Sequence, residues 1–174
     1  MLSAALTNAI NTQIALELSS GYVYLGMAMW CAENGFKGAG HWLQKQFAEE
    51  QEHAFKLLHY LQERDAEVKL HDIPAPKAEY AGLKEVFEAA LKHEEHVTAS
   101  INKLYELAVN EKDYATQIML QWFVDEQVEE ENNVKDILDS FKMVGAHGGS
   151  MYMLDRSLGS DRKSTRLNSS HVSQ

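Results

Sequence analysis

Two pairs of side chains in this sequence have the residue types and the spacing to bind a metal ion. Glu50 and His53 lie three residues apart, and Gln127 and Glu130 have the same separation. Residues three apart share one face of an α-helix, so each pair can direct its ligand atoms toward one point. Oxygen ligands with a single imidazole suit Fe(II) or Mn(II), and zinc accepts such a set as well. The spacing therefore predicts a cation site, provided that helices bring the two pairs together.

The elements that must position these side chains are four long amphipathic helices. Apolar residues recur at helical spacing over about residues 3–33, 38–65, 79–110 and 113–144. The inward stripe of each segment is apolar except near its middle, where a Glu, or a Gln followed by a Glu, interrupts it. The interrupting residues are Glu17, Glu50, Glu94, Gln127 and Glu130.

These interruptions are predicted to lie at one level of the molecule. Short turns join the first two segments and the last two, which indicates two antiparallel helical hairpins. The midpoint of Glu17 and Glu50 falls beside the first turn, and the midpoint of Glu94 and Gln127 falls beside the second. One offset of 77 residues relates the members of the first pair to those of the second. The chain thus resembles two copies of one hairpin, each with its own ligand set.

A buried layer of acids needs a compensating charge. A buried carboxylate costs several kcal/mol unless it is paired or binds a metal. The central stripes contain no Lys or Arg, so two divalent cations would neutralise the layer. A single Glu on a long helix is usually solvated, but four interruptions that agree with two turn midpoints favour a shared site. Tyr24, on the inward face one to two turns from Glu17, is either a core aromatic or a neighbour of the site.

The remaining pattern predicts an all-α fold with a single domain over residues 1–160. The connection at about residues 66–78 contains Pro74 and Pro76 and is long enough to run back along the bundle, so we expect one long crossover between the hairpins. A short fifth helix is expected over residues 150–158. Residues 161–174 are rich in Ser, Asn and Arg without helical periodicity, and we interpret them as a disordered tail foreign to the domain.

Composition argues against several classes of partner. The 174 residues carry a formal net charge of −10, which opposes nucleic-acid binding, because phosphates require clustered cations. No run approaches the roughly 18 consecutive apolar residues of a membrane span, and the N-terminus lacks the pattern of a signal peptide. The single cysteine, Cys31, cannot form an internal disulfide. We therefore expect a cytoplasmic protein without a membrane or nucleic-acid partner.

Over about residues 1–158 the motifs resemble those of the bacterial haem-free ferritins, which are di-iron four-helix bundles. The resemblance is carried by Glu17, Glu49–Glu50–Gln51–Glu52–His53, Glu94 and Glu126–Gln127–Val128–Glu129–Glu130. It implies a ferritin-like antiparallel bundle that oxidises Fe(II) with O2 or H2O2. It also implies a shell of 24 subunits in which the ferric mineral collects, with the fifth helix at the four-fold axes.

The resemblance also implies a role for each ligand. Glu17, Glu50 and His53 would hold a first iron, and Glu50 would bridge to a second iron held with Glu94 and Glu130. Gln127 would lie close to the second iron, and Tyr24 would supply an electron. The residues implied for a third iron are Glu49, Glu126, Glu129 and Glu130. From their charges alone, Glu49, Glu126 and Glu129 could form a further cation site beside the pair.

Two departures and three alternatives qualify this expectation. The second ligand motif is Gln127-x-x-Glu130, where bacterioferritins, rubrerythrins and di-iron oxygenases keep a second Glu-x-x-His. Glu52 stands where bacterioferritins place a haem-binding Met, so no haem is expected. The alternatives are a di-iron peroxidase or oxygenase, a miniferritin that shields DNA, and a metal-free interaction bundle. A miniferritin would share its ligands across a subunit interface, whereas here one chain supplies all of them.

Overall fold

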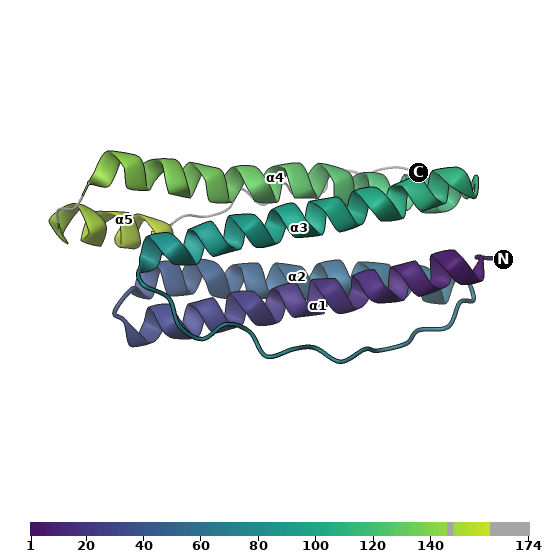
Figure 1. The fold of residues 1–174 in the computed structure, drawn as a ribbon, viewed down its shortest axis with the longest axis horizontal. Helices are drawn as coiled ribbons and strands as arrows, with labels where there is room; N and C mark the ends of the chain where they lie inside the picture. Colours follow the sequence, from purple (N-terminus) through teal and green to yellow (C-terminus); the bar gives the residue numbers. More distant parts are fainter. Residues whose placement is uncertain (146–147, 161–174) are drawn as a thin grey trace, which may run out of the picture.

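The computed structural model describes residues 1–145 and 148–160, and the regular structure within them is entirely helical. The elements are α1 (Ala4–Glu33), α2 (Lys37–Glu63), α3 (Leu83–Asn110), α4 (Tyr114–Val144) and α5 (Gly148–Ser160). The predicted all-α bundle with a short fifth helix is confirmed (Figure 1). The predicted tail, residues 161–174, lies outside the described residues, and the domain boundary at residue 160 stays a prediction.

Local side-chain chemistry sets the ends of the helices. The Ser3 hydroxyl accepts a hydrogen bond from Leu6 N at 3.1 Å and caps α1. Asp113 caps α4 in the same way, accepting from Thr116 N at 2.9 Å. The helix expected from residue 79 begins instead at Leu83. The preceding segment stays non-helical, and the Glu85 carboxylate reaches back to accept the backbone N–H of Ala81.

The connection between α2 and α3 crosses the whole length of the bundle. Figure 1 shows it running beside α1 from one end to the other, so α3 begins at the same end as α2. Asn11 of α1 fixes its first part: its Nδ2 donates to Glu67 O at 2.8 Å, and its Oδ1 accepts from Lys69 N at 2.7 Å. At the other end Pro76 packs on Gly26, where an added Cβ would lie 2.9 Å from the proline ring. The predicted crossover topology is therefore present.

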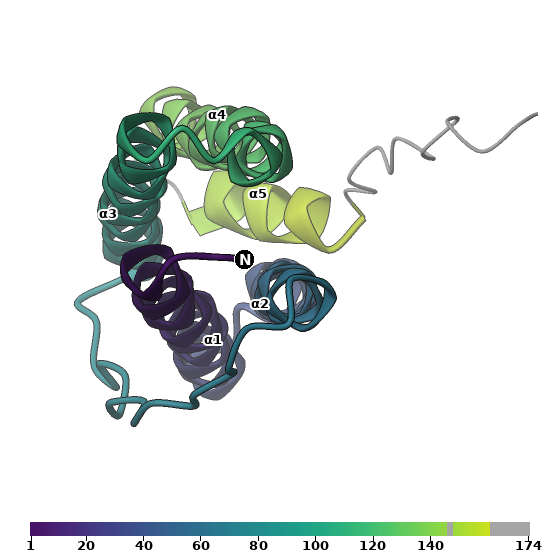
Figure 2. The ribbon, with the colours of Figure 1, turned by 90° about the vertical axis from the view of Figure 1, so that its right-hand side faces the viewer.

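α5 closes one end of the bundle, where it packs against α2 and α4 (Figure 2). Leu154 and Leu158 of α5 are buried in the core. The Asp155 carboxylate accepts the backbone N–H groups of Gly38 at 3.1 Å and Ala39 at 2.8 Å. These bonds satisfy donors at the beginning of α2 that would otherwise have no partner within the helix.

The apolar core consists of two clusters along the bundle axis. One contains Tyr24, Phe87 and Phe141 at the α5 end, and the other contains Leu6, Leu57 and Phe123 toward the opposite end. The five polar residues that interrupt the predicted inward stripes are all buried. Within the described residues, no helix combines the length and the apolar composition that crossing a bilayer requires. The polar layer described next lies between the two clusters.

Candidate metal centre

All four long helices contribute polar side chains to one buried layer. The six members are each at most 4% exposed: Glu17, Glu50, His53, Glu94, Gln127 and Glu130. In the part of the chain that the structure describes, no Lys or Arg is buried. Among the described residues, no buried Lys or Arg therefore balances the charge of these carboxylates. This agrees with the prediction that the interrupted stripes meet inside the bundle.

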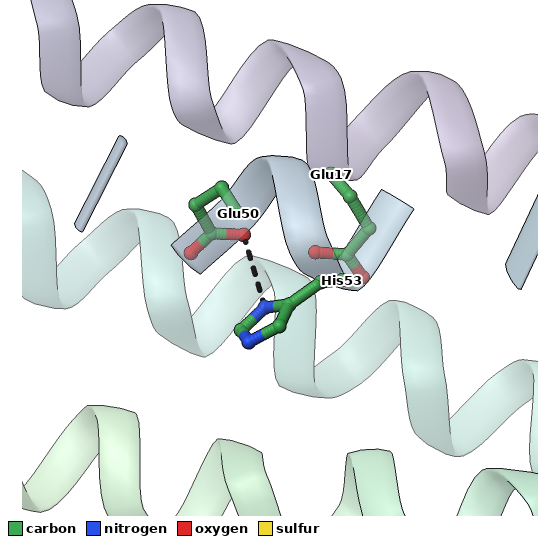
Figure 3. Close-up of side chains that lie close together, drawn as sticks. All are labelled: Glu17, Glu50 and His53. Carbon is green, nitrogen blue, oxygen red and sulfur yellow. Dashed lines mark ion pairs between the residues drawn. The ribbon is translucent and has the colours of Figure 1, made fainter. Parts of the chain in front are cut away.

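The first ligand group joins α1 to α2. Glu17, Glu50 and His53 each offer one ligand atom, and these atoms lie within 4.8 Å of one another. Figure 3 shows the three side chains converging between the helices. His53 Nδ1 lies 3.4 Å from Glu50 Oε2, as the three-residue separation on α2 allows. The group can hold one cation with two carboxylates and an imidazole.

The second ligand group joins the same imidazole to α4. His53, Glu126 and Glu130 bring their ligand atoms within 4.8 Å of one another, and His53 Nε2 lies 3.9 Å from Glu126 Oε1. The histidine ring thus has one nitrogen toward Glu50 and the other toward Glu126. Glu126, a residue predicted for a third iron, therefore lies against the layer, although its side chain is 23% exposed.

The Glu94 carboxylate accepts hydrogen bonds from two side chains, and among the described residues it belongs to neither convergent group. The Tyr24 hydroxyl donates to Glu94 Oε1, and Gln127 Nε2 donates to Glu94 Oε2 at 3.1 Å. The sequence left open whether Tyr24 is a core aromatic or a neighbour of the site, and in the structure it is both. Burial, and then the charge of Glu94, raises the pKa of Tyr24 well above its usual value. Its hydroxyl remains a hydrogen-bond donor at neutral pH.

The charged form of Glu17 is costly in this environment. Its pKa is raised well above the ordinary range, first by burial and then by the nearby Glu50 carboxylate. Its Oε1 accepts a hydrogen bond from Gln13, whereas its Oε2 accepts none from the described residues. A divalent cation beside Glu17 would offset the repulsion between the Glu17 and Glu50 carboxylates and would give Glu17 Oε2 a binding partner.

Two further residues predicted for a third iron lie nearer the surface. Glu49 is half-buried and Glu129 is exposed. Among the described residues neither belongs to a group of three convergent ligands. The third site therefore stays a prediction, with Glu126 and Glu130 as the members that the fold brings closest to His53.

Sequence reasoning missed two glutamines that contact the layer. Gln13 Nε2 donates to Glu17 Oε1 at 2.8 Å, and Gln46 Nε2 donates to Glu130 Oε2 at 2.8 Å. Both are nearly inaccessible, at 2% and 1% exposed. Each lies four residues before a stripe glutamate, a spacing that places it on the same helix face. That spacing was a usable signal for Gln13, whereas the contact of Gln46 crosses to another helix.

Known proteins resemble this chain in both sequence and fold. The ferritin-like domain family matches residues 7–144. A bacterial non-heme ferritin of Campylobacter jejuni is 41% identical over 156 residues, which cover 90% of this chain and 93% of that protein. A bacterial non-heme ferritin of Escherichia coli is 36% identical over 158 residues, covering 91% and 96%. The open pore ferritin of the archaeon Archaeoglobus fulgidus superimposes with a TM-score of 0.91 at 37% identity, covering 93% of this chain and 100% of that one.

Proposed function

The chain belongs to the ferritin family of iron-storage proteins, and from that premise we propose that it oxidises Fe(II) at the buried layer. The observation that carries the proposal is the layer itself: carboxylates and an imidazole from four helices meet between two apolar clusters without a buried Lys or Arg among the described residues. Such a set of oxygen donors with one imidazole suits Fe(II).

Two Fe(II) ions are the substrates of the proposed reaction. Glu17, Glu50 and His53 would hold the first, and Glu50 would bridge to a second held with Glu94 and Glu130. The two ions give up one electron each, which together reduce O2 to H2O2 with two protons, or H2O2 to two molecules of water. The convergence of the first three ligand atoms within 4.8 Å supports the first position.

Gln127 and Tyr24 would act on the second position through Glu94. Both residues donate hydrogen bonds to the Glu94 carboxylate. These hydrogen bonds would orient the carboxylate and hold it within the polar layer. Tyr24 would supply an electron when the oxidant takes up more than the two electrons of the Fe(II) ions, and its hydrogen bond to Glu94 supports this role. The third iron would be held by Glu49, Glu126, Glu129 and Glu130.

Membership of the family also supports a proposal for the wider assembly. We propose a cytoplasmic homo-oligomer of 24 subunits, built from residues 1–160, in which the ferric mineral collects in the central hollow. The docking of α5 through Leu154, Leu158 and Asp155 supports a fixed position for this helix within the subunit. The storage function and the oxidation site would then be linked within one shell.

Aerobic Fe(II) titration of the assembled protein tests the proposal. Wild type should oxidise about two to three Fe(II) per subunit rapidly and continue to a soluble mineral, whereas a Glu50→Ala, His53→Ala double variant should lose the rapid phase. Glu52→Ala, His59→Ala is the matched control, because it removes the same residue types from exposed positions of α2. If the double variant keeps the rapid phase, the layer does not carry the oxidation.

A further inference from the structure

Gln13 links Glu17, which lies in the same helix α1, to helix α3. Its side chain is 2% exposed, and its Nε2 donates to Glu17 Oε1 at 2.8 Å. Its Oε1 in turn accepts a hydrogen bond from Ser100 Oγ in α3 at 2.6 Å. The Glu17 carboxylate accepts from the nitrogen end of the amide, so the oxygen end faces the Ser100 hydroxyl, which donates to it. The orientation of the amide is therefore set by two partners on different helices.

This link makes the two oxygens of Glu17 unequal. Oε1 is engaged by the Gln13 amide, whereas Oε2 accepts no hydrogen bond from the described residues although it is buried. A buried carboxylate oxygen without a hydrogen bond is costly unless a ligand fills the place. Since Glu17 converges with Glu50 and His53, Oε2 is the oxygen left for a cation.

We propose that Gln13 is a positioning residue that makes Glu17 a one-oxygen ligand, with Ser100 fixing the Gln13 amide. The inference rests on the proposed function, because it assumes that Glu17 binds Fe(II). A carboxylate that binds through both oxygens occupies two coordination positions. By holding Oε1 away from the metal, Gln13 keeps one position open for the oxidant or for exchange of the product ion. Partners of this kind orient metal ligands and tune the metal in many proteins.

Anaerobic Co(II) titration of the assembled protein tests the role of Gln13, because Co(II) reports its coordination number in its visible absorption and is stable without oxidation. The difference between the Co(II) bound by wild type and by a Glu50→Ala, His53→Ala double variant is the Co(II) bound in the layer. Gln13→Met keeps the length of the side chain but removes the donor. We expect Gln13→Met to weaken the affinity of this site for Co(II) by about 10-fold, a typical effect of losing such a partner.

The absorption spectrum separates positioning from general loosening. In Gln13→Met both oxygens of Glu17 can reach the metal, so the coordination number should rise and the absorption per Co(II) should fall. Ser100→Ala should shift affinity and spectrum in the same direction by a smaller amount. Asn11→Leu is the matched control, because it removes another buried amide from α1. It should leave the Co(II) spectrum unchanged.

Each failure has its own signature. If Gln13→Met binds Co(II) with the affinity and spectrum of wild type, the positioning role is overturned while the proposed function stands. If Asn11→Leu has the same effect as Gln13→Met, α1 has merely loosened and the inference is again wrong. If the Glu50→Ala, His53→Ala variant binds as much Co(II) as wild type, the proposed function fails and the inference fails with it.

Discussion

Replacing Glu17 by glutamine should stabilise the metal-free protein and weaken its response to metal. The substitution preserves the shape of the side chain and an oxygen that can still accept from Gln13. It removes a buried negative charge beside Glu50, and its amide nitrogen can donate to the Glu50 carboxylate. Glutamine at position 17 therefore suits the metal-free layer better than glutamate does, but it is a poorer ligand for a cation.

The size of the effect follows from the environment of Glu17, which is 1% exposed and has one buried oxygen without a hydrogen bond from the described residues. A buried polar atom left unsatisfied costs about 1–3 kcal/mol, so we expect a gain of about 2 kcal/mol. For a chain of this length that corresponds to a rise in melting temperature of roughly 4–8 °C. At a Co(II) concentration about 100 times its dissociation constant, wild type gains about 2.7 kcal/mol, which would cancel the advantage of the variant.

Differential scanning calorimetry at one scan rate and near-neutral pH measures both effects. Wild type and Glu17→Gln are compared after treatment with a chelator and again with excess Co(II) under nitrogen. Glu106→Gln removes an exposed carboxylate from α3 and serves as the control for a change in net charge. We expect the control to shift the melting temperature by less than the buried substitution in either condition.

One result would refute this reasoning directly. If the metal-free Glu17→Gln protein melts at or below the wild-type temperature while the control is unaffected, the buried carboxylate does not destabilise the empty layer. The link between missing charge compensation and cation binding would then be lost. A variant that retains the full Co(II) stabilisation would show in addition that Glu17 is not a ligand.

Two further predictions concern the ends of α2. Arg64 donates to both oxygens of Asp113 at 3.0 and 2.8 Å and holds the pKa of that carboxyl well below its usual range. Asp113→Asn should therefore lower the free energy of unfolding by about 1–2 kcal/mol at neutral pH. In urea titrations the difference between the two proteins should shrink as the pH falls below about 4, the pKa of Asp113 in the unfolded chain. A difference that stays constant down to pH 3 would contradict this prediction. Asp155→Ala should cost about 1 kcal/mol and expose α5 to proteolysis. Gly38→Ala should be worse, because its Cβ would lie 1.7 Å from the Asp155 carbonyl oxygen; unchanged cleavage in both variants would refute the docking.

The fold was predictable because its helices are long and regular. Stripe periodicity identified all four long helices, and the two short turns with one long connection indicated the crossover. Periodicity places the start of α3 about one turn too early, because it does not reveal the local contact between Glu85 and Ala81. The docking of α5 was equally hidden, because it depends on a side chain of one helix reaching the backbone of another.

The centre of the site was predictable for a related reason. A Glu on an apolar stripe is visible as an exception, and the level of a residue in an antiparallel hairpin follows from its distance to the turn. The partners of those acids are less visible, since a buried Gln off the stripe looks like a solvated one. Gln46 illustrates this limit: its contact with Glu130 joins helices whose relative rotation the sequence does not specify.

The repeat of the ligands does not extend to the side chains that hold them, and this makes the two halves of the layer chemically unequal. The offset of 77 residues that relates Glu17 to Glu94 places Ala90 opposite Gln13 and Ile101 opposite Tyr24. Glu17 is consequently held by one amide and keeps one oxygen for a cation, whereas Glu94 has both oxygens engaged by Tyr24 and Gln127. A cation at the second position must compete with these hydrogen bonds, and it lacks a histidine from its own hairpin. We therefore expect the position of Glu17, Glu50 and His53 to fill first as metal is added.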